Sequence, residues 1–121
     1  MTHISYKTAK RLKEFLGESV PEPMLNDWYI IRRDSSHPFV STPATEDETH
    51  LINGPAAYSL HDLLSKPFCE AMALARRTPQ ASEVYTRIVW GPQISKVLSE
   101  VYYHSGLPAV EKELMKMMDG K

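Results

Sequence analysis

The chain has 121 residues and little of what would assign a protein to a functional class at sight. Cys69 is its one cysteine, so no disulfide can form within the chain, and we expect a reducing, cytoplasmic compartment. No stretch of about 18 apolar residues occurs, so we expect no membrane-spanning segment and no signal peptide. The formal net charge of -1 argues against a dedicated nucleic-acid binder, because such proteins usually carry a basic excess.

Motifs for cofactor or metal binding are also missing. The five glycines are scattered, whereas a phosphate-binding loop needs glycines close together so that its amides can surround the oxygens. The histidines at positions 3, 37, 50, 61 and 104 include no pair at metal-ligand spacing. His50 beside the acidic run 46–48 is a local cluster, but a solvated, mobile loop over residues 42–49 is the simpler interpretation. We therefore expect neither a cofactor nor a bound metal.

Candidate catalytic residues are few. Cys69 and His61 could form a nucleophilic pair, with Glu70 and His104 as further candidates, since a thiolate needs a nearby base or cation. The neighbours of Cys69 are mostly apolar, however, which is typical of a small buried thiol without a catalytic role. Asp62 and Glu70 could pair as acid and base, but Asp62 is better explained as a helix cap. We expect that the protein is not an enzyme.

The central segment AYSLHDLLSKPFCEAMA (57–73) predicts two short helices joined at a proline. Ser59 and Asp62 resemble a capping box with the shorter acid, placed just before three leucines at helical spacing. Pro67 interrupts this helix within two turns, and a second apolar set follows at positions 68, 71, 72 and 75. We expect a helical corner that turns core side chains inward.

The N-terminal third combines a helix with a small β element. Ser5 is expected to cap the first helix, and Gly17 suits the left-handed position at its end. The aromatic and β-branched residues 28–31 predict a strand that pairs as a hairpin with residues 39–40. Residues 51–52 are a candidate third strand.

The remainder of the chain predicts helices. Thr78-Pro79 places a good cap before a proline at the first helical position. The apolar residues that follow at helical spacing form the expected stripe, namely Ala81, Val84, Tyr85, Ile88 and Val89. Gly91-Pro92 is expected to kink or restart the helix. A pair of C-terminal helices then covers 92–104 and 108–118, with Ser105-Gly106 between them.

Together these elements predict a single domain over residues 1–121. Its class is α+β and mostly α, with about five helices and a small antiparallel β-hairpin in the N-terminal third. Residues 1–55 hold the first helix, the β element and a loop, and residues 56–121 form the helical part.

The opening segment ISYKTAKRLKEF (4–15) is similar to the start shared by many short phage open reading frames. Two further segments, AYSLHDLLSKPFCEAMA (57–73) and VYYHSGLPAVEKELMKMM (101–118), resemble a known group of proteins. The group consists of small uncharacterised proteins from prophages and other mobile elements of bacteria. The resemblance implies a mobile-element setting, and it implies no activity and no functional residue.

A basic surface is one candidate for binding. Lys7, Lys10 and Arg11 lie on the outer face of the first helix, and Arg32 and Arg33 follow the first strand. If the helix packs against the hairpin, these charges could converge on nucleic acid or on an acidic partner. The balanced net charge favours an ordinary solvated helix face instead.

An apolar surface is the other candidate. Tyr103 and Met115 fall outside the apolar stripes of the C-terminal helix pair, which predicts exposed side chains that a partner protein or a second copy could contact. The leading hypothesis is therefore a non-enzymatic protein-interaction or accessory protein of a phage or mobile element, with inhibition of a host protein as one specific form. The alternative is a nucleic-acid-binding accessory protein that uses the basic N-terminal helix.

Overall fold

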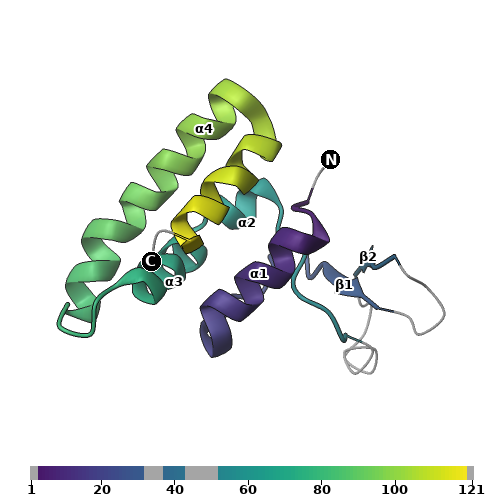
Figure 1. Ribbon diagram of the computed structural model, residues 1–121, viewed down its shortest axis with the longest axis horizontal. Coiled ribbons are helices and arrows are strands. Elements are labelled where there is room, and N and C mark those ends of the chain that lie inside the picture. Colours follow the sequence, from purple (N-terminus) through teal and green to yellow (C-terminus); the bar gives the residue numbers. More distant parts are fainter. Residues whose placement is uncertain (1–2, 32–36, 43–51, 120–121) are drawn as a thin grey trace.

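The structure, a computed structural model, describes residues 3–31, 37–42 and 52–119. This part of the chain contains four α-helices, a short 3-10 helix and a two-stranded antiparallel hairpin (Figure 1). The elements are α1 (Tyr6–Leu16), η1 (Gly17–Ser19), β1 (Trp28–Ile30), β2 (Phe39–Ser41), α2 (Leu60–Leu64), α3 (Lys66–Arg76) and α4 (Glu83–Asp119). The predicted class, α+β and mostly α with a hairpin in the N-terminal third, is confirmed.

Helix α1 begins and ends where the sequence predicts. The Ser5 hydroxyl accepts a hydrogen bond of 3.3 Å from the Thr8 amide, which satisfies one of the free donors at the helix start. Gly17 ends the helix with a φ of 61°, a value that costs other residues strain. Leu12 and Leu16 face the core, so the basic residues of the helix point outward.

The hairpin pairs Trp28 with Ser41 and Ile30 with Phe39, close to the predicted strands. The other edge of β1 bonds with residues 55–57, where the Tyr29 amide donates to the Pro55 carbonyl at 2.9 Å. The prediction of a third strand at 51–52 is wrong at Ile52, which belongs to no strand, and residue 51 lies outside the described residues.

The turn at residues 53–54 explains why the pairing with β1 occurs at residues 55–57 and not at the predicted residues 51–52. The side-chain amide of Asn53 bonds with the backbone of Ile31 in both directions, taking the place of a neighbouring strand. Gly54 then passes so close to β1 that a Cβ at this position would stand 2.3 Å from the Tyr29 carbonyl oxygen. Only a glycine can approach the strand this closely. The residues that follow Gly54 therefore make the hydrogen bonds with β1.

The corner between α2 and α3 is confirmed. Ser59 caps α2, and the backbone N–H of Ser59 donates to the Asp62 carboxylate at 2.9 Å, which completes the capping box. Ser65 has extended backbone angles between the two helices and caps α3, where Pro67 occupies the first turn. A proline in the first turn of a helix loses no hydrogen bond, so Pro67 begins α3 more than it interrupts α2.

Helix α4 differs from the prediction at its start. It begins at Glu83, and the Tyr85 amide donates to the Ser82 hydroxyl at 3.4 Å. The predicted start at Thr78-Pro79 is wrong, because the Thr78 carbonyl accepts only a turn hydrogen bond, from the Ala81 amide at 3.0 Å. Arg77 closes this loop by donating to the Ala81 carbonyl at 3.0 Å.

The middle of α4 also differs. Gly91-Pro92 does not restart the helix, since only Gly106, with φ 79° and ψ -176°, leaves the helical angles. The described part therefore has four helices where about five were predicted. Gly106 is the predicted stop, and it divides α4 into a first arm (83–105) and a second arm (107–119). The second arm folds back so that it lies between the first arm and α1 (Figure 1).

The core lies where α1, α2, α3 and both arms meet. Helix α3 runs along α4 and contributes Phe68 and Met72, while the second arm contributes Val110 and Leu114. The backbone N–H of Ser5, just before α1, donates to the Glu111 carboxylate of the second arm at 2.7 Å. The N-terminal helix is thus held by the last part of the chain.

Candidate functional site

The thiol of Cys69 is buried, as predicted. It donates to the Leu63 carbonyl at 3.3 Å. Burial raises the pKa of Cys69 to about 11, with the nearby Ser95 hydroxyl acting in the opposite direction. At neutral pH the group is therefore a thiol and a poor nucleophile. His61 lies exposed on α2, and the structure brings no base to Cys69 among the described residues.

The carboxylate of Asp62 serves as a cap, which confirms that interpretation. It is buried and accepts hydrogen bonds from the Ser59 amide at 2.9 Å and from the Met24 amide at 2.8 Å. The second bond attaches the loop before β1 to α2. Because its oxygens are already occupied by backbone donors, Asp62 has a structural role, and Glu70 lies instead on α3 facing Gly91.

A histidine–carboxylate pair that the sequence did not predict ties the N-terminal segment to the hairpin. The Nε2 atom of His3 lies 2.7 Å from the Oδ2 atom of Asp27. The Thr42 hydroxyl donates to the other oxygen of Asp27. The threonine contacts the carboxylate and not the imidazole, so this group lacks the nucleophile–base–acid order of a catalytic triad. Its partners are 24 positions apart, so no local motif could have revealed the pair.

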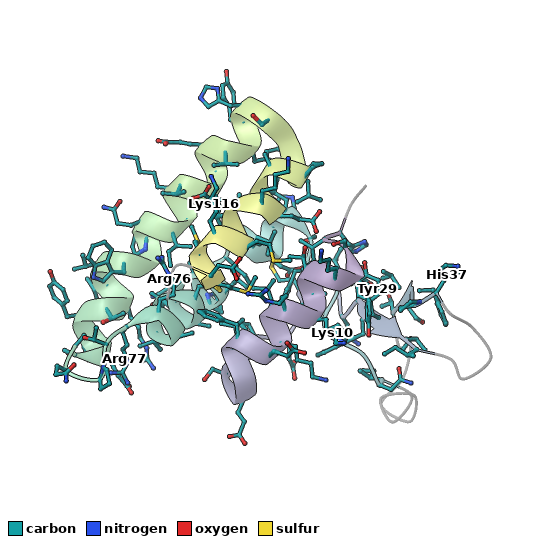
Figure 2. The ribbon with its side chains drawn as sticks, viewed as in Figure 1. Lys10, Tyr29, His37, Arg76, Arg77 and Lys116 are labelled. Carbon is teal, nitrogen blue, oxygen red and sulfur yellow. The ribbon has the colours of Figure 1, made fainter. Side chains whose placement is uncertain are left out.

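The predicted basic surface is present in part. Lys7, Lys10 and Arg11 are exposed and line a shallow groove of about 350 Å³ on α1, and Arg11 donates to the Asp119 carboxylate. Figure 2 labels Lys10 on α1, the helix whose Tyr6 ring contacts the ring of Tyr29 on β1. Arg32 and Arg33 lie outside the described residues, so their convergence with α1 stays a prediction.

The two residues predicted as a partner surface have different environments. Tyr103 is 84 % exposed, as expected, and its ring meets that of His104 edge-on at 5.3 Å. Met115 is half-buried and packs against the hydrophobic core, so the expectation that it is exposed is wrong. The second arm has neighbours on two sides, and its buried sector is accordingly wider than one apolar stripe. The structure does not join Tyr103 and Met115 into one exposed surface.

A larger apolar surface lies on the first arm, within the apolar stripe that the sequence predicts there. Val84, Tyr85 and Ile88 are 63 %, 59 % and 67 % exposed. Together with exposed Pro92, one turn further on, they form what we call the outer face. These three residues of the predicted stripe therefore face away from the core, and Thr86, Ile94 and Leu98 are buried residues of the first arm. Apolar side chains this close together on a monomer surface often mark a binding site.

The phase of the helix explains the exposure. Ile88 and Ile94 are separated by a rotation of about 120° at about 100° per residue, so their two stripes cannot share one face. A kink at Gly91-Pro92 could have brought both stripes inward, but the helix continues without one. The sequence thus contained the signal, since a straight helix with two offset stripes must expose one of them.

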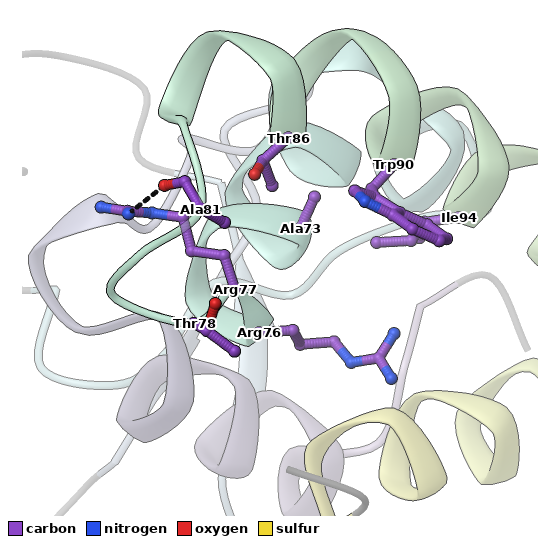
Figure 3. Close-up of a pocket in the computed structure, with 8 residues that line it drawn as sticks. All are labelled: Ala73, Arg76, Arg77, Thr78, Ala81, Thr86, Trp90 and Ile94. Atoms are coloured by element: carbon purple, nitrogen blue, oxygen red, sulfur yellow. Dashed lines mark hydrogen bonds between the residues drawn. The ribbon is translucent and has the colours of Figure 1, made fainter.

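Open clefts lie on both sides of the first arm where it meets α3, within the described residues. The larger has a volume of about 450 Å³ and adjoins the outer face, with which it shares Ile88 and Pro92. Its other lining residues are Leu64, Lys66, Cys69, Glu70, Arg87, Gly91 and Ser95. The smaller, of about 330 Å³, lies on the side of Trp90 (Figure 3). It is lined further by Ala73, Arg76, Arg77, Thr78, Ala81, Thr86 and Ile94.

Comparisons with known proteins supply no relative for this arrangement. No family model, curated protein or solved structure matches the chain. No helix of the described residues is long and apolar enough to cross a membrane. Within residues 3–31, 37–42 and 52–119 no three histidine, cysteine or acidic side chains gather where they could hold a metal ion, and the predicted acidic cluster at 46–50 lies outside these ranges.

Proposed function

We propose that this protein is a non-enzymatic interaction protein whose outer face binds an apolar segment of a partner protein. The observation that carries the proposal is the exposure of Val84, Tyr85 and Ile88 side by side on the first arm. Because these side chains are exposed in the free protein, a partner that covers them buries new apolar surface. Burying each of them contributes about 1 kcal/mol or more to the free energy of binding.

The larger cleft supports the same proposal. Protein interfaces are anchored by a few side chains that fill pockets, with charged residues at the rim. This cleft continues from the outer face at Ile88 and Pro92, and Lys66, Glu70 and Arg87 also line it. Gly91 brings α4 close to α3 at the same place, because a Cβ there would lie 3.3 Å from the Cγ atom of Glu70. An apolar anchor of the partner fits this position.

The setting is part of the proposal. The resemblance of residues 57–73 and 101–118 to proteins of prophages and mobile elements supports a bacterial origin and a role in a phage or mobile element. A single buried cysteine is compatible with the cytoplasm. In its most specific form, the partner is a host protein that this protein inhibits. That step rests on analogy between small proteins without catalytic motifs.

Site-specific photo-crosslinking in bacterial cells tests the proposal. A benzophenone amino acid replaces Tyr85 on the outer face. In a matched control it replaces Leu25 on the loop before β1, which is 64 % exposed against 59 % for Tyr85. We expect a crosslinked partner from position 85 that is absent from position 25. Ile88→Ser should remove the product, whereas Met24→Ser should leave it unchanged.

Three results would overturn this function. Identical crosslinked products from positions 85 and 25 indicate non-specific contacts. No crosslinked product from position 85 indicates that no partner binds the outer face. A crosslinked dimer of the chain itself would make the outer face a homo-oligomer interface and exclude a separate partner there. Sedimentation of the unaltered protein over a range of concentrations identifies that case independently.

A second candidate function is nucleic-acid binding by α1. The observation that favours it is the groove in which Lys7, Lys10 and Arg11 lie together. Glu14 lines the same groove and Arg11 is paired with Asp119, which reduces the charge available to phosphates. Binding to duplex DNA that weakens steeply with salt, and that Lys7→Gln with Lys10→Gln removes, would support this function over the first.

A further inference from the structure

The smaller cleft lies on the opposite side of the first arm from the outer face. Ile88 and Trp90 are two positions apart in one helix, which is a rotation of about 200°. A partner on the outer face therefore leaves this cleft open. Its volume of about 330 Å³ matches the lower end of the range for ligand sites. What it binds is consequently a question separate from the proposed function.

The charges that line the cleft have one sign. Among the residues that the structure describes, Arg76 and Arg77 both line it, and no acidic residue does. The Arg77 guanidinium is already used, because it donates to the Ala81 carbonyl at 3.0 Å and to the Glu83 carboxylate at 3.1 Å. The Arg76 side chain is exposed and has no hydrogen bond or ion pair within the described part of the chain. Arg76 is therefore the cation available to an anion in this cleft.

The opposite wall is apolar. Trp90 is 54 % exposed and stands beside Ile94, with Ala73 between the two helices. Figure 3 shows the Arg76 side chain, which comes from α3, extending toward the end of the cleft at which the Trp90 ring of α4 lies. An indole wall binds apolar and aromatic groups through its face. The cleft thus offers an apolar contact and one cationic donor group next to each other.

We infer that this cleft binds a short peptide segment in which an apolar side chain is followed by a carboxylate. The apolar side chain packs on Trp90 and Ile94, and the carboxylate accepts hydrogen bonds from the Arg76 guanidinium, whose planar donors suit that group. A nucleic acid fits less well, because its backbone needs a row of cations and the described residues give this cleft one free cation. The hydroxyl of Thr86 is not available, since it donates to the Ser82 carbonyl at 2.7 Å.

Two matched peptides test the inference on the full chain. In a Trp28→Phe background, Trp90 is the only tryptophan, and its fluorescence reports on the cleft. The probes are acetyl-Ala-Leu-Glu-Ala-amide and the same peptide with Gln in place of Glu. We expect saturable binding at millimolar concentrations, about fivefold tighter for the acidic peptide, since an exposed ion pair contributes about that factor. Arg76→Gln should abolish the difference, whereas Arg87→Gln, an exposed arginine on the first arm outside this cleft, should preserve it.

The outcomes separate this site from the outer face. Equal binding of both peptides, no binding of either, or an unchanged preference in Arg76→Gln with an unaltered NMR spectrum would each overturn the inference. A short single-stranded DNA that quenches Trp90 at lower concentration than both peptides would assign the cleft to nucleic acid and overturn it as well. Val84→Ser with Ile88→Ser should leave peptide binding intact, so a failed outer face and a failed cleft give different results.

Discussion

The two arms of α4 have similar apolar spacing and different surroundings. In the second arm Val110, Leu114 and Met117 are buried. In the first arm Val84 and Ile88 are exposed to solvent. The second arm lies between the first arm and α1, while only one side of the first arm rests on α3 (Figure 1). An apolar stripe therefore identifies a helix with a face to cover, and the packing of the chain decides whether anything within the chain covers it.

The largest effect should come from replacing one leucine of the covered arm. Leu114→Ala removes a fully buried side chain and should lower the free energy of unfolding by about 3 kcal/mol. Ile88→Ala removes a side chain of similar size that is mostly exposed, and the change should stay within about 0.5 kcal/mol. Urea unfolding of both variants measures the difference. An equal loss in the two variants would mean that Ile88 is covered in solution.

The corner between the arms should give the next largest effect. Gly106 has φ 79° and ψ -176°, a region that only glycine occupies readily, so Gly106→Ala should cost about 2 kcal/mol. Gly91→Ala is the control, because Gly91 has helical angles. Its added Cβ would meet the flexible Glu70 side chain at 3.3 Å and the Glu70 backbone only at the ordinary contact distance of 3.7 Å. Thermal unfolding should show a clear decrease in melting temperature for Gly106→Ala alone. Similar values for both variants would contradict a strained corner.

The platform beneath the arms should respond more weakly. Ser59→Ala removes the N-cap of α2 and should destabilise the protein by about 1 kcal/mol. Ser99→Ala, at an exposed position in the first arm, should change the stability by less than about 0.5 kcal/mol. If Ser59→Ala leaves the melting temperature unchanged, the capping box does not fix the start of α2.

The smallest effect concerns pH. The pKa of the Cys69 thiol is about 11 in the folded protein and near its ordinary value of 9.0 in the unfolded chain. The unfolded chain therefore loses this proton first as pH rises. The contribution of the thiol to stability is complete below about pH 9 and is lost between about pH 9 and 11. Cys69→Ala should lack this loss, with a difference on the order of 1 kcal/mol near pH 10 in urea unfolding.

The same thiol reports on how firmly the first arm rests on α3. Cys69 lines the larger cleft beneath Ile88 and Pro92 and is nevertheless buried. A thiol reagent at neutral pH should label it slowly in the native protein, at a rate set by opening of the arm. Rapid stoichiometric labelling would show that the first arm separates from α3. The difference in packing between the first and second arms would then be greater than the structure indicates.

Local signals predicted much of the fold. Ser5, Gly17, the box of Ser59 and Asp62, and Gly106 each act through their own backbone neighbours, so their roles can be recognised without knowing the rest of the chain. The hairpin was predicted for the same reason, from the β-branched and aromatic character of its first strand.

The candidate site was less accessible to prediction, because it depends on what lies far away in the sequence. Two caps compete at the start of α4, and Arg77 holds the preceding loop so that Ser82 is the one used. Pro92 was expected to change the helix direction, and its failure to do so exposes Ile88. The neighbours of Arg76 and Trp90 become known only when α3 is placed beside α4.

The hydrogen bond between the Ser5 amide and Glu111 has a consequence for synthesis on the ribosome. Residues 6–16 leave the exit tunnel long before Glu111 and Asp119, the residues that hold α1 in place, have been added. Until then Leu12 and Leu16 have no second arm to cover them, and a chaperone can bind them. The packing of α1 is consequently completed only after residue 119 has emerged, when the second arm of α4 can fold back beside α1.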